Sequence, residues 1–148
     1  MKLKLEYLAG CGTFSECRFR TPFYEKEVRG LAFICRSGPA VWEPQSLLLV
    51  CGGLIPSGRE PLALWLDERK GRGAAGFLAD LSGEEEERID ALAKACRERE
   101  LVFGTVAAKR FASLINEYSH LIASRTDGTV RAYDRVLEDL QHRFYTSG

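Results

Sequence analysis

The sequence predicts an α+β protein in which strands come first and helices follow. Short segments with a hydrophobic period of two, separated by Gly- and Pro-containing turns, fill the chain up to residue 81. From Ser82 onward, apolar residues recur every three or four positions instead, as they do on one face of a helix. We therefore expect a six-stranded antiparallel β-barrel within residues 2–81, followed by three helices.

The first three expected strands lie before residue 37. Lys2–Ala9, KLKLEYLA, alternates charged and apolar side chains and predicts a half-buried strand. Gly10–Gly12 is a turn, and Thr13–Arg20 alternates again, so the two segments suggest a hairpin. Val28–Arg36 predicts the third strand, where Gly30 indicates a bend, a bulge or a close backbone approach.

The remaining three expected strands complete the barrel. Ser46–Cys51 is almost entirely apolar and predicts a buried strand. Pro61–Asp67, PLALWLD, alternates, which places its leucines on one face of a strand. Phe77–Leu81 follows a Gly-rich turn and predicts the last strand.

A helix is expected directly after the barrel, where it would close one barrel end. Ser82 and Glu85 have the spacing of a capping box, in which each side chain bonds the backbone of the other residue. The acidic side chains of Glu84–Glu87 then lie at the N-terminus of the helix, where the helix dipole favours negative charge. We favour this interpretation over a metal or basic-partner site, because the side chains of consecutive helical residues point in different directions. The division predicted from this pattern is a barrel with its closing helix over residues 1–100 and a helical hairpin over residues 101–148.

The helical hairpin is expected to pack on the barrel or in an oligomer interface. Leu101–Gly104 is interpreted as an apolar break, and Thr105 as the cap of a helix that runs to about Ala123. A last helix over residues 129–145 carries an apolar seam, which favours a homodimer through the C-terminal helices. The seam consists of Val130, Tyr133, Leu137, Leu140 and Phe144.

Composition is that of an ordinary globular domain. The 148 residues are 45% hydrophobic and 28% charged, which is enough for one core. Lys plus Arg and Asp plus Glu both number 21, so the formal net charge is zero, which argues against a nucleic-acid binder. The longest apolar run, Leu47–Cys51, is far below the ~20 residues of a membrane span. We expect a cytoplasmic protein without a cofactor.

Five cysteines are present, an odd number, and no CxxC occurs, which predicts free thiols rather than a disulfide framework or a zinc site. Cys11 and Cys17 would face each other across the first hairpin. His120 and His142 are isolated in sequence, so a base for a cysteine nucleophile is not evident.

The segment GFLADLSGEEEER, residues 76–88, resembles the end of the barrel in PilZ domains, a bacterial family that binds cyclic di-GMP. In that family a strand of the approximate form G-x-x-F-x-D-L-S is followed by a charged helix. The likeness extends loosely over residues 2–99. The resemblance implies a β-barrel and a role in signalling.

The ligand motifs of the PilZ family are largely missing. Glu25–Gly30 occupies the place of the D-x-S-x-x-G motif, where only Gly30 matches and Glu27 puts a carboxylate in the place of Ser. Nothing at the N-terminal MKLK corresponds to the R-x-x-x-R motif. Arg131 and Arg135 have its spacing, but they lie in the expected last helix, where a solvated face is the simpler interpretation. The resemblance therefore implies a member that has lost nucleotide binding.

Three functions remain open. The first is a non-catalytic regulatory or adaptor module that acts through contacts with an unidentified protein. The second is a cyclic-dinucleotide sensor with an atypical arginine site, and the third is a small cysteine-dependent enzyme. Candidate ligand residues for the sensor are Arg18, Arg20, Arg29, Gly30, Arg131 and Arg135.

Overall fold

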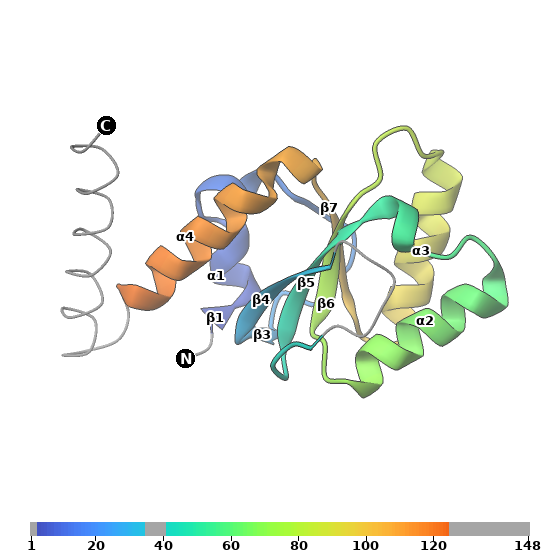
Figure 1. Ribbon diagram of the computed structural model, residues 1–148, viewed down its shortest axis with the longest axis horizontal. Helices are drawn as coiled ribbons and strands as arrows, with labels where there is room; N and C mark the ends of the chain where they lie inside the picture. The colour runs from blue at the N-terminus through green and yellow to red at the C-terminus, as the bar shows by residue number, and fades with distance from the viewer. Residues whose placement is uncertain (1–2, 35–40, 125–148) are drawn as a thin grey trace.

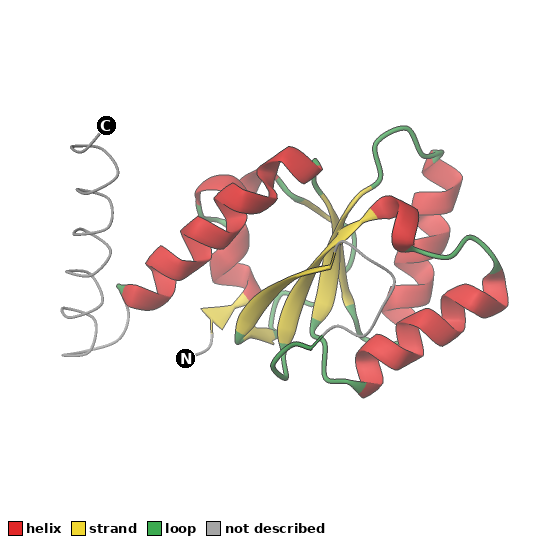
Figure 2. Ribbon diagram, viewed as in Figure 1, coloured by secondary structure: helices red, strands yellow, loops and turns green. Residues whose placement is uncertain are grey.

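The computed structural model describes residues 3–34 and 41–124 and shows a sheet with helices on both faces (Figure 1 and Figure 2). The order of the five-stranded sheet is β2-β7-β6-β5-β4. Its strands are β2 (Arg18–Phe19), β4 (Gly30–Ile34), β5 (Ser46–Cys51), β6 (Gly76–Asp80) and β7 (Val102–Thr105). Strands β4 to β7 are parallel neighbours in chain order, and β2 pairs antiparallel with β7. A small second sheet pairs β1 (Leu3–Lys4) with β3 (Glu27–Val28).

The helices form the outer layers of the molecule. Helices α2 (Arg59–Gly71) and α3 (Glu86–Glu98) cover one face of the sheet (Figure 1). Helices α1 (Leu5–Ala9) and α4 (Phe111–Ala123) lie on the other face. Three short 3₁₀ helices join these elements: η1 (Gly12–Glu16), η2 (Gly52–Leu54) and η3 (Ala108–Arg110).

The sheet divides the core into two clusters, because successive side chains of a strand point to opposite faces. Leu48, Phe77 and Phe103 pack on the side of α2 and α3. Leu49 and Leu78 pack on the side of α1 and α4. The central strands are therefore buried on both faces, which explains why their sequences are apolar at consecutive positions.

The prediction of a protein with both strands and helices is confirmed, but the antiparallel barrel is wrong for the described residues. The three central strand pairs are parallel, and β2 and β4 lie at the two edges of the sheet. Leu101–Gly104, interpreted as a break, contributes to β7, which lies between β2 and β6. The expected division at residue 100 thus falls between α3 and β7, and β7 belongs to the same sheet as the strands that precede residue 100. Consecutive apolar residues, as in Ser46–Cys51, are typical of parallel strands that are buried on both faces.

The strand expected at Pro61–Asp67 is also wrong, because this segment lies in α2. Leu62 and Leu66 are four residues apart, so they share one face of a helix and both contact the core. Leu64, which alternation placed beside them, is 72% exposed. Over such a short length, alternating leucines are compatible both with the two-residue period of a strand and with the 3.6-residue period of a helix.

The first expected hairpin is replaced mainly by helical structure. In this segment Leu3–Lys4 forms β1, and Leu5–Ala9 forms α1, whose buried residues Leu5 and Leu8 are three apart. The first half of Thr13–Arg20 lies in η1, and Arg18–Phe19 forms β2. Alternation over eight residues was therefore not sufficient to identify a strand here.

The predicted strands at Ser46–Cys51 and Phe77–Leu81 are confirmed as β5 and β6. The third predicted strand, Val28–Arg36, is confirmed in part: Gly30–Ile34 forms β4, whereas Val28 ends β3 of the second sheet, and residues 35–36 lie outside the described residues. A side chain at Gly30 would contact the Ser46 hydroxyl oxygen at 3.1 Å. The close-approach interpretation of this glycine is therefore supported.

The helix after β6 is confirmed, but its expected cap is wrong. Helix α3 begins at Glu86 with Glu85 as its N-cap, and the Ser82 hydroxyl donates to Asp80 instead. Gly83 turns the chain there with a φ of 85°. The expected apolar face is buried and comprises Ile89, Leu92, Ala93 and Cys96.

Helix α4 ends at Ala123 as predicted, but it begins at Phe111, because Thr105 belongs to β7. The last expected helix at 129–145, with the seam residues Val130, Tyr133, Leu137, Leu140 and Phe144, lies outside the described residues. The same holds for Cys35, Arg131, Arg135 and His142.

Candidate functional site

The candidate site lies where neighbouring strands send the chain to opposite faces of the sheet. Strand β6 is followed by α3 on one face, whereas β7 is followed by α4 on the other (Figure 1). In open α/β sheets, such a point opens a crevice at the carboxyl ends of the strands, where ligands commonly bind. A cavity of about 290 Å³ occupies this position. Its lining comprises Glu16, Arg18, Asp80, Leu81, Ser82, Ile89, Thr105, Val106 and Ala107.

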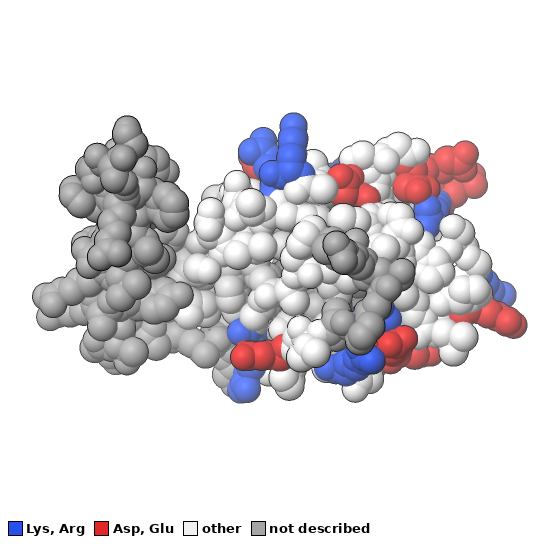
Figure 3. Space-filling model, in the orientation of Figure 1, with Lys and Arg blue, Asp and Glu red and all other residues white. Residues whose placement is uncertain are grey.

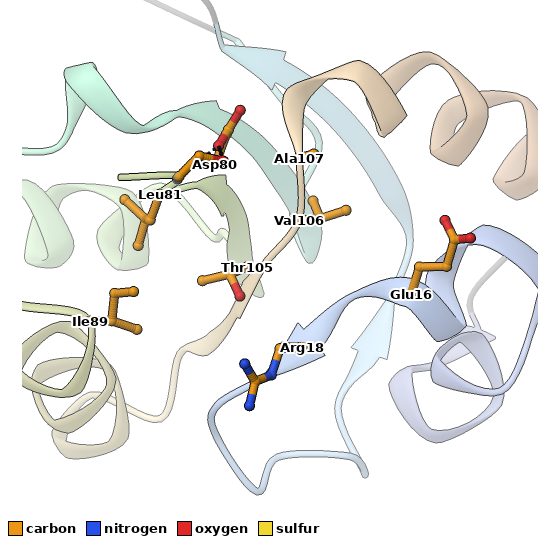
Figure 4. Close-up of a pocket in the computed structure, with 9 residues that line it drawn as sticks. Glu16, Arg18, Asp80, Leu81, Ile89, Thr105, Val106 and Ala107 are labelled. Atoms are coloured by element: carbon orange, nitrogen blue, oxygen red, sulfur yellow. Dashed lines mark hydrogen bonds between the residues drawn. The ribbon is translucent and has the colours of Figure 1, made fainter. Parts of the chain in front are cut away.

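Arg18 and Thr105 form one wall of this cavity as a cross-strand pair. They are directly opposite each other in the β2–β7 register, so their side chains share a face of the sheet. Phe103, two residues before Thr105, packs in the core on the α3 side of the sheet. Because residues two apart in a strand point to the same face, Thr105 and Arg18 also lie on the α3 side. Leu81 and Ile89 are 5% and 7% exposed and supply an apolar floor. Figure 4 shows the side chains of Leu81, Ile89 and Thr105 on this side of β7, with Arg18 beside them.

Asp80 joins the two segments that border the cavity. Its carboxylate accepts hydrogen bonds from the Ser82 hydroxyl at 2.5 Å and from the Ser82 and Ala108 backbone N–H groups at 3.0 and 2.9 Å. These donors favour the ionised form and lower the pKa of Asp80, with the Ser82 hydroxyl as the largest cause. A carboxylate held in this way is a weak base.

Most other charged groups around the cavity are paired. Glu16 lies 3.4 Å from Arg110, and Figure 4 shows its carboxylate directed away from Arg18. Arg20 contacts Glu86 at 2.6 Å, and this hydrogen bond is the main reason that the pKa of Glu86 is lowered. Among the described residues, Arg18 takes part in no ion pair within 4.0 Å, although its charge adds to the lowering of the Glu86 pKa.

The arginines predicted to form a dinucleotide site are not brought together. Arg18 and Arg20 lie at the β2 edge of the sheet, and Arg20 is engaged with Glu86. Arg29 and Gly30 lie at the β4 edge, on the other side of the sheet. The described residues of the expected site therefore lie at opposite edges of the sheet, and of these residues only Arg18 lines the cavity.

The four described cysteines are free thiols. Cys11 and Cys17 flank η1 instead of facing each other across a hairpin. Burial raises the pKa of Cys17 and of Cys96 to about 12, so both stay protonated at neutral pH. Cys51 is half-buried beside η2.

A second hollow of about 540 Å³ lies between α2 and α3. Its sides include the apolar residues Leu62, Ala63, Ala91 and Ala95 and the charged residues Arg59, Lys94, Glu98 and Arg99. It is larger than the cavity at the strand ends, but it is a groove between two surface helices. We rank the smaller cavity first because its walls come from the ends of neighbouring strands, which hold side chains at fixed spacing.

Surface charge in the described part of the chain agrees with the zero net charge of the sequence. On the face in Figure 3, acidic and basic side chains lie next to each other in several small groups, with white surface between the groups. Within residues 3–34 and 41–124, no group of three His, Cys, Asp or Glu side chains is arranged to hold a metal ion. No helix in these ranges has the length and hydrophobicity needed to cross a membrane.

Comparisons with protein-family models, curated proteins and solved structures gave no match for this chain. The PilZ resemblance therefore gains no support from relatives, and the antiparallel barrel that it implies is not the fold of the described residues. Functional inference rests on the geometry of the cavity.

Several residues of the cavity were not identified as site residues from the sequence. Asp80 and Thr105 each follow an apolar run and end a strand, which was the available signal. Parallel pairing brings the two strand ends side by side, and this could be recognised only if both runs had been assigned as parallel strands. Arg18 was identified, but for a different site.

Proposed function

We propose that this chain is a non-catalytic binding module whose ligand lies in the cavity at the carboxyl ends of β6 and β7. The observation that carries this proposal is the divergence of α3 and α4 to opposite faces of the sheet directly above that cavity. Two polar groups, Arg18 and the Thr105 hydroxyl, lie beside the apolar floor, and neither has a side-chain partner among residues 3–34 and 41–124. This combination of a few polar groups with apolar surface is common in sites for small molecules.

A non-catalytic role is supported by the chemistry of the nearby nucleophiles. The Ser82 hydroxyl donates to Asp80 at 2.5 Å, which resembles a nucleophile with its base. The lowered pKa of Asp80 makes it a poor acceptor of that proton. Cys17 is a poor nucleophile because burial raises its pKa to about 12, so the reactive thiolate does not form at neutral pH.

A regulatory role is supported by the path of the chain after the cavity. The segment Thr105–Ala107 lines the cavity and continues into η3 and α4. Ala108, at the start of η3, is bonded to Asp80 on the opposite rim. A ligand between the rims therefore contacts the segment that positions α4. We place this module in the cytoplasm.

A fragment screen by two-dimensional ¹H–¹⁵N NMR tests the proposal. Fragments that bind should shift the amide signals of Arg18, Ser82 and Thr105–Ala107 together, while the signals of α2 stay in place. Fragments that shift only the amide signals of α2 and α3 would show that the ligand site is the groove between those helices and not the cavity. A screen in which no fragment shifts the cavity signals would refute the proposed site.

A second candidate is the adaptor role, with the groove between α2 and α3 as the protein-binding surface. It is favoured by the exposure of Leu64, at 72%, on a helix that also lines the groove. Arg59 and Lys94 beside Leu62 would suit an amphipathic helix with acidic residues. A photo-crosslinker at Ala91 should then capture one discrete partner in cells, and a crosslinker at Glu25, on a different surface, should not. Equal capture from both positions would count against the groove.

A further inference from the structure

We propose that the cavity at the carboxyl ends of β6 and β7 binds a small monocarboxylate, with its anionic group on Arg18 and its apolar body on Leu81 and Ile89. This inference rests on the proposed function and names its ligand class. The cross-strand register fixes Arg18 opposite Thr105 on the α3 face of the sheet. A guanidinium group and a hydroxyl group thus border one side of the apolar floor.

Among the described residues that line the cavity, Arg18 is the cation available to a ligand. The carboxylate of Glu16 pairs with Arg110, and that of Asp80 is occupied by the Ser82 and Ala108 donors. Glu86 is bonded to Arg20. In the described part of the chain, no acidic group lies within ion-pair distance of Arg18, so its planar donors remain free for a carboxylate.

Thr105 adds a second polar contact on the same wall. Its hydroxyl makes no hydrogen bond to a side chain or backbone group within the described residues, and it borders the cavity. A hydroxyl can donate to a carboxylate oxygen while the guanidinium binds the same group. The pair on β2 and β7 is therefore suited to one small anionic group.

The surrounding charge favours a monoanion over a dianion. The acidic run Glu84–Glu87 leads into the first turn of α3, close to the Ser82 and Ile89 rim. Repulsion from these carboxylates grows with the charge of the ligand, so a phosphate dianion is disfavoured relative to a carboxylate. Leu81 and Ile89, both nearly buried, further favour a ligand with an apolar body.

The volume of the cavity limits the size of that body. About 290 Å³ is just below the range of roughly 300–1,000 Å³ that is typical of small-molecule sites. A short alkyl or small aromatic acid fits this space, whereas a dinucleotide would lie mostly outside it.

Titration with matched probes tests the inference. Hexanoate, its neutral amide hexanamide and the dianion hexyl phosphate share one alkyl chain and differ in charge. We expect hexanoate to shift the Arg18 and Thr105 amide signals and to bind at least about 10-fold more tightly than either analogue. Acetate, which keeps the charge and loses the chain, should bind at least about 10-fold more weakly because it cannot cover the floor.

Variants locate the contact without disturbing the core. Arg18 is exposed, so Arg18→Gln should fold normally and lower hexanoate affinity at least about 10-fold, with a smaller loss for Arg18→Lys. Lys70→Gln removes one positive charge from α2, away from the cavity, and should leave affinity unchanged. Circular dichroism of each variant confirms that the fold is retained.

Each outcome separates the inference from the proposed function. Equal affinity for hexanoate and hexanamide, or no effect of Arg18→Gln, would overturn the carboxylate assignment. Neutral fragments that still bind in the cavity would then leave the binding module intact. A cavity that binds neither these probes nor any screened fragment would refute both.

Discussion

The Asp80 carboxylate accepts the Ala108 backbone N–H at 2.9 Å, and this contact joins the segments that follow two neighbouring strands. The same carboxylate binds Ser82, so one side chain fixes both rims of the cavity.

Replacing Asp80 by Ala should lower the free energy of unfolding by about 1 kcal/mol, because solvent reaches part of the carboxylate and weakens its bonds. The pKa of Asp80 is lowered in the folded state, so its stabilisation is complete above the ordinary pKa of 3.8 and declines as the pH falls below it. Urea unfolding at several pH values measures this difference. Asp90→Ala, an exposed position on α3, should change stability by less than about 0.5 kcal/mol. If the difference in free energy of unfolding between wild type and Asp80→Ala increased at acidic pH, the stabilising role of the ionised Asp80 carboxylate would be contradicted.

Two Gly→Ala substitutions should have opposite effects on stability. A side chain at Gly76 would overlap the Val102 carbonyl oxygen in the neighbouring strand β7, so Gly76→Ala should cost about 3 kcal/mol. Gly71 ends α2 with open space around it, so Gly71→Ala should raise stability by about 0.5 kcal/mol. Chemical denaturation of both variants gives the two values. A Gly76→Ala variant with an unchanged free energy of unfolding would mean that β6 and β7 are not packed this closely.

Tyr118→Phe should destabilise the fold by about 1–2 kcal/mol, because the buried Tyr118 hydroxyl donates to the Val28 carbonyl oxygen at 3.0 Å. Burial raises the pKa of Tyr118 from 10.0 to about 12. A raised pKa means that this stabilisation is complete below pH 10.0 and is lost as the pH approaches about 12.

The stability difference between wild type and Tyr118→Phe, measured by urea unfolding, should therefore shrink at alkaline pH. Cys17 and Cys96 also titrate there, but they are present in both proteins and their effects cancel. A difference that does not change up to pH 12 would show that the hydroxyl is not buried in this way.

Thiol titration should distinguish the cysteines by their burial. Under denaturing, non-reducing conditions all five should react with Ellman's reagent. In the native protein Cys17 and Cys96 should react last, because burial both shields the sulfur and raises the pKa to about 12. Cys17→Ala should thus remove a slow phase and leave the fast phase unchanged. Fewer than five thiols after denaturation would reveal a disulfide or another modification.

The sequence was informative where burial alone determined the structure. Strands β5 and β6 were located from short apolar runs between turns. The direction of pairing was not evident, because an apolar run is compatible with either partner orientation until the connecting segments are known. A parallel connection between β5 and β6 requires a crossover, and α2 supplies it; the alternating leucines of Pro61–Asp67 predict a strand there, which leads to an antiparallel barrel instead.

The candidate site was less accessible from the sequence than the strands. Its residues come from β2, β6, β7 and α3, and no short motif contains them together. Arg18 was identified by its residue type alone. Its significance depends on the register that sets it opposite Thr105, and a register is a tertiary property.

The pairing of β2 with β7 has a consequence for the synthesis of the chain. The hydrogen bond from the Phe103 backbone N–H to the Thr21 hydroxyl, next to this pairing, spans 82 positions of sequence. At translation rates of about 5–20 residues per second, the ribosome delivers β2 several seconds before its partner strand. Strands β4, β5 and β6 can assemble during that interval, so the cavity wall formed by Arg18 and Thr105 is completed last. A translational pause before residue 102 would prolong the state in which the β6 edge remains open.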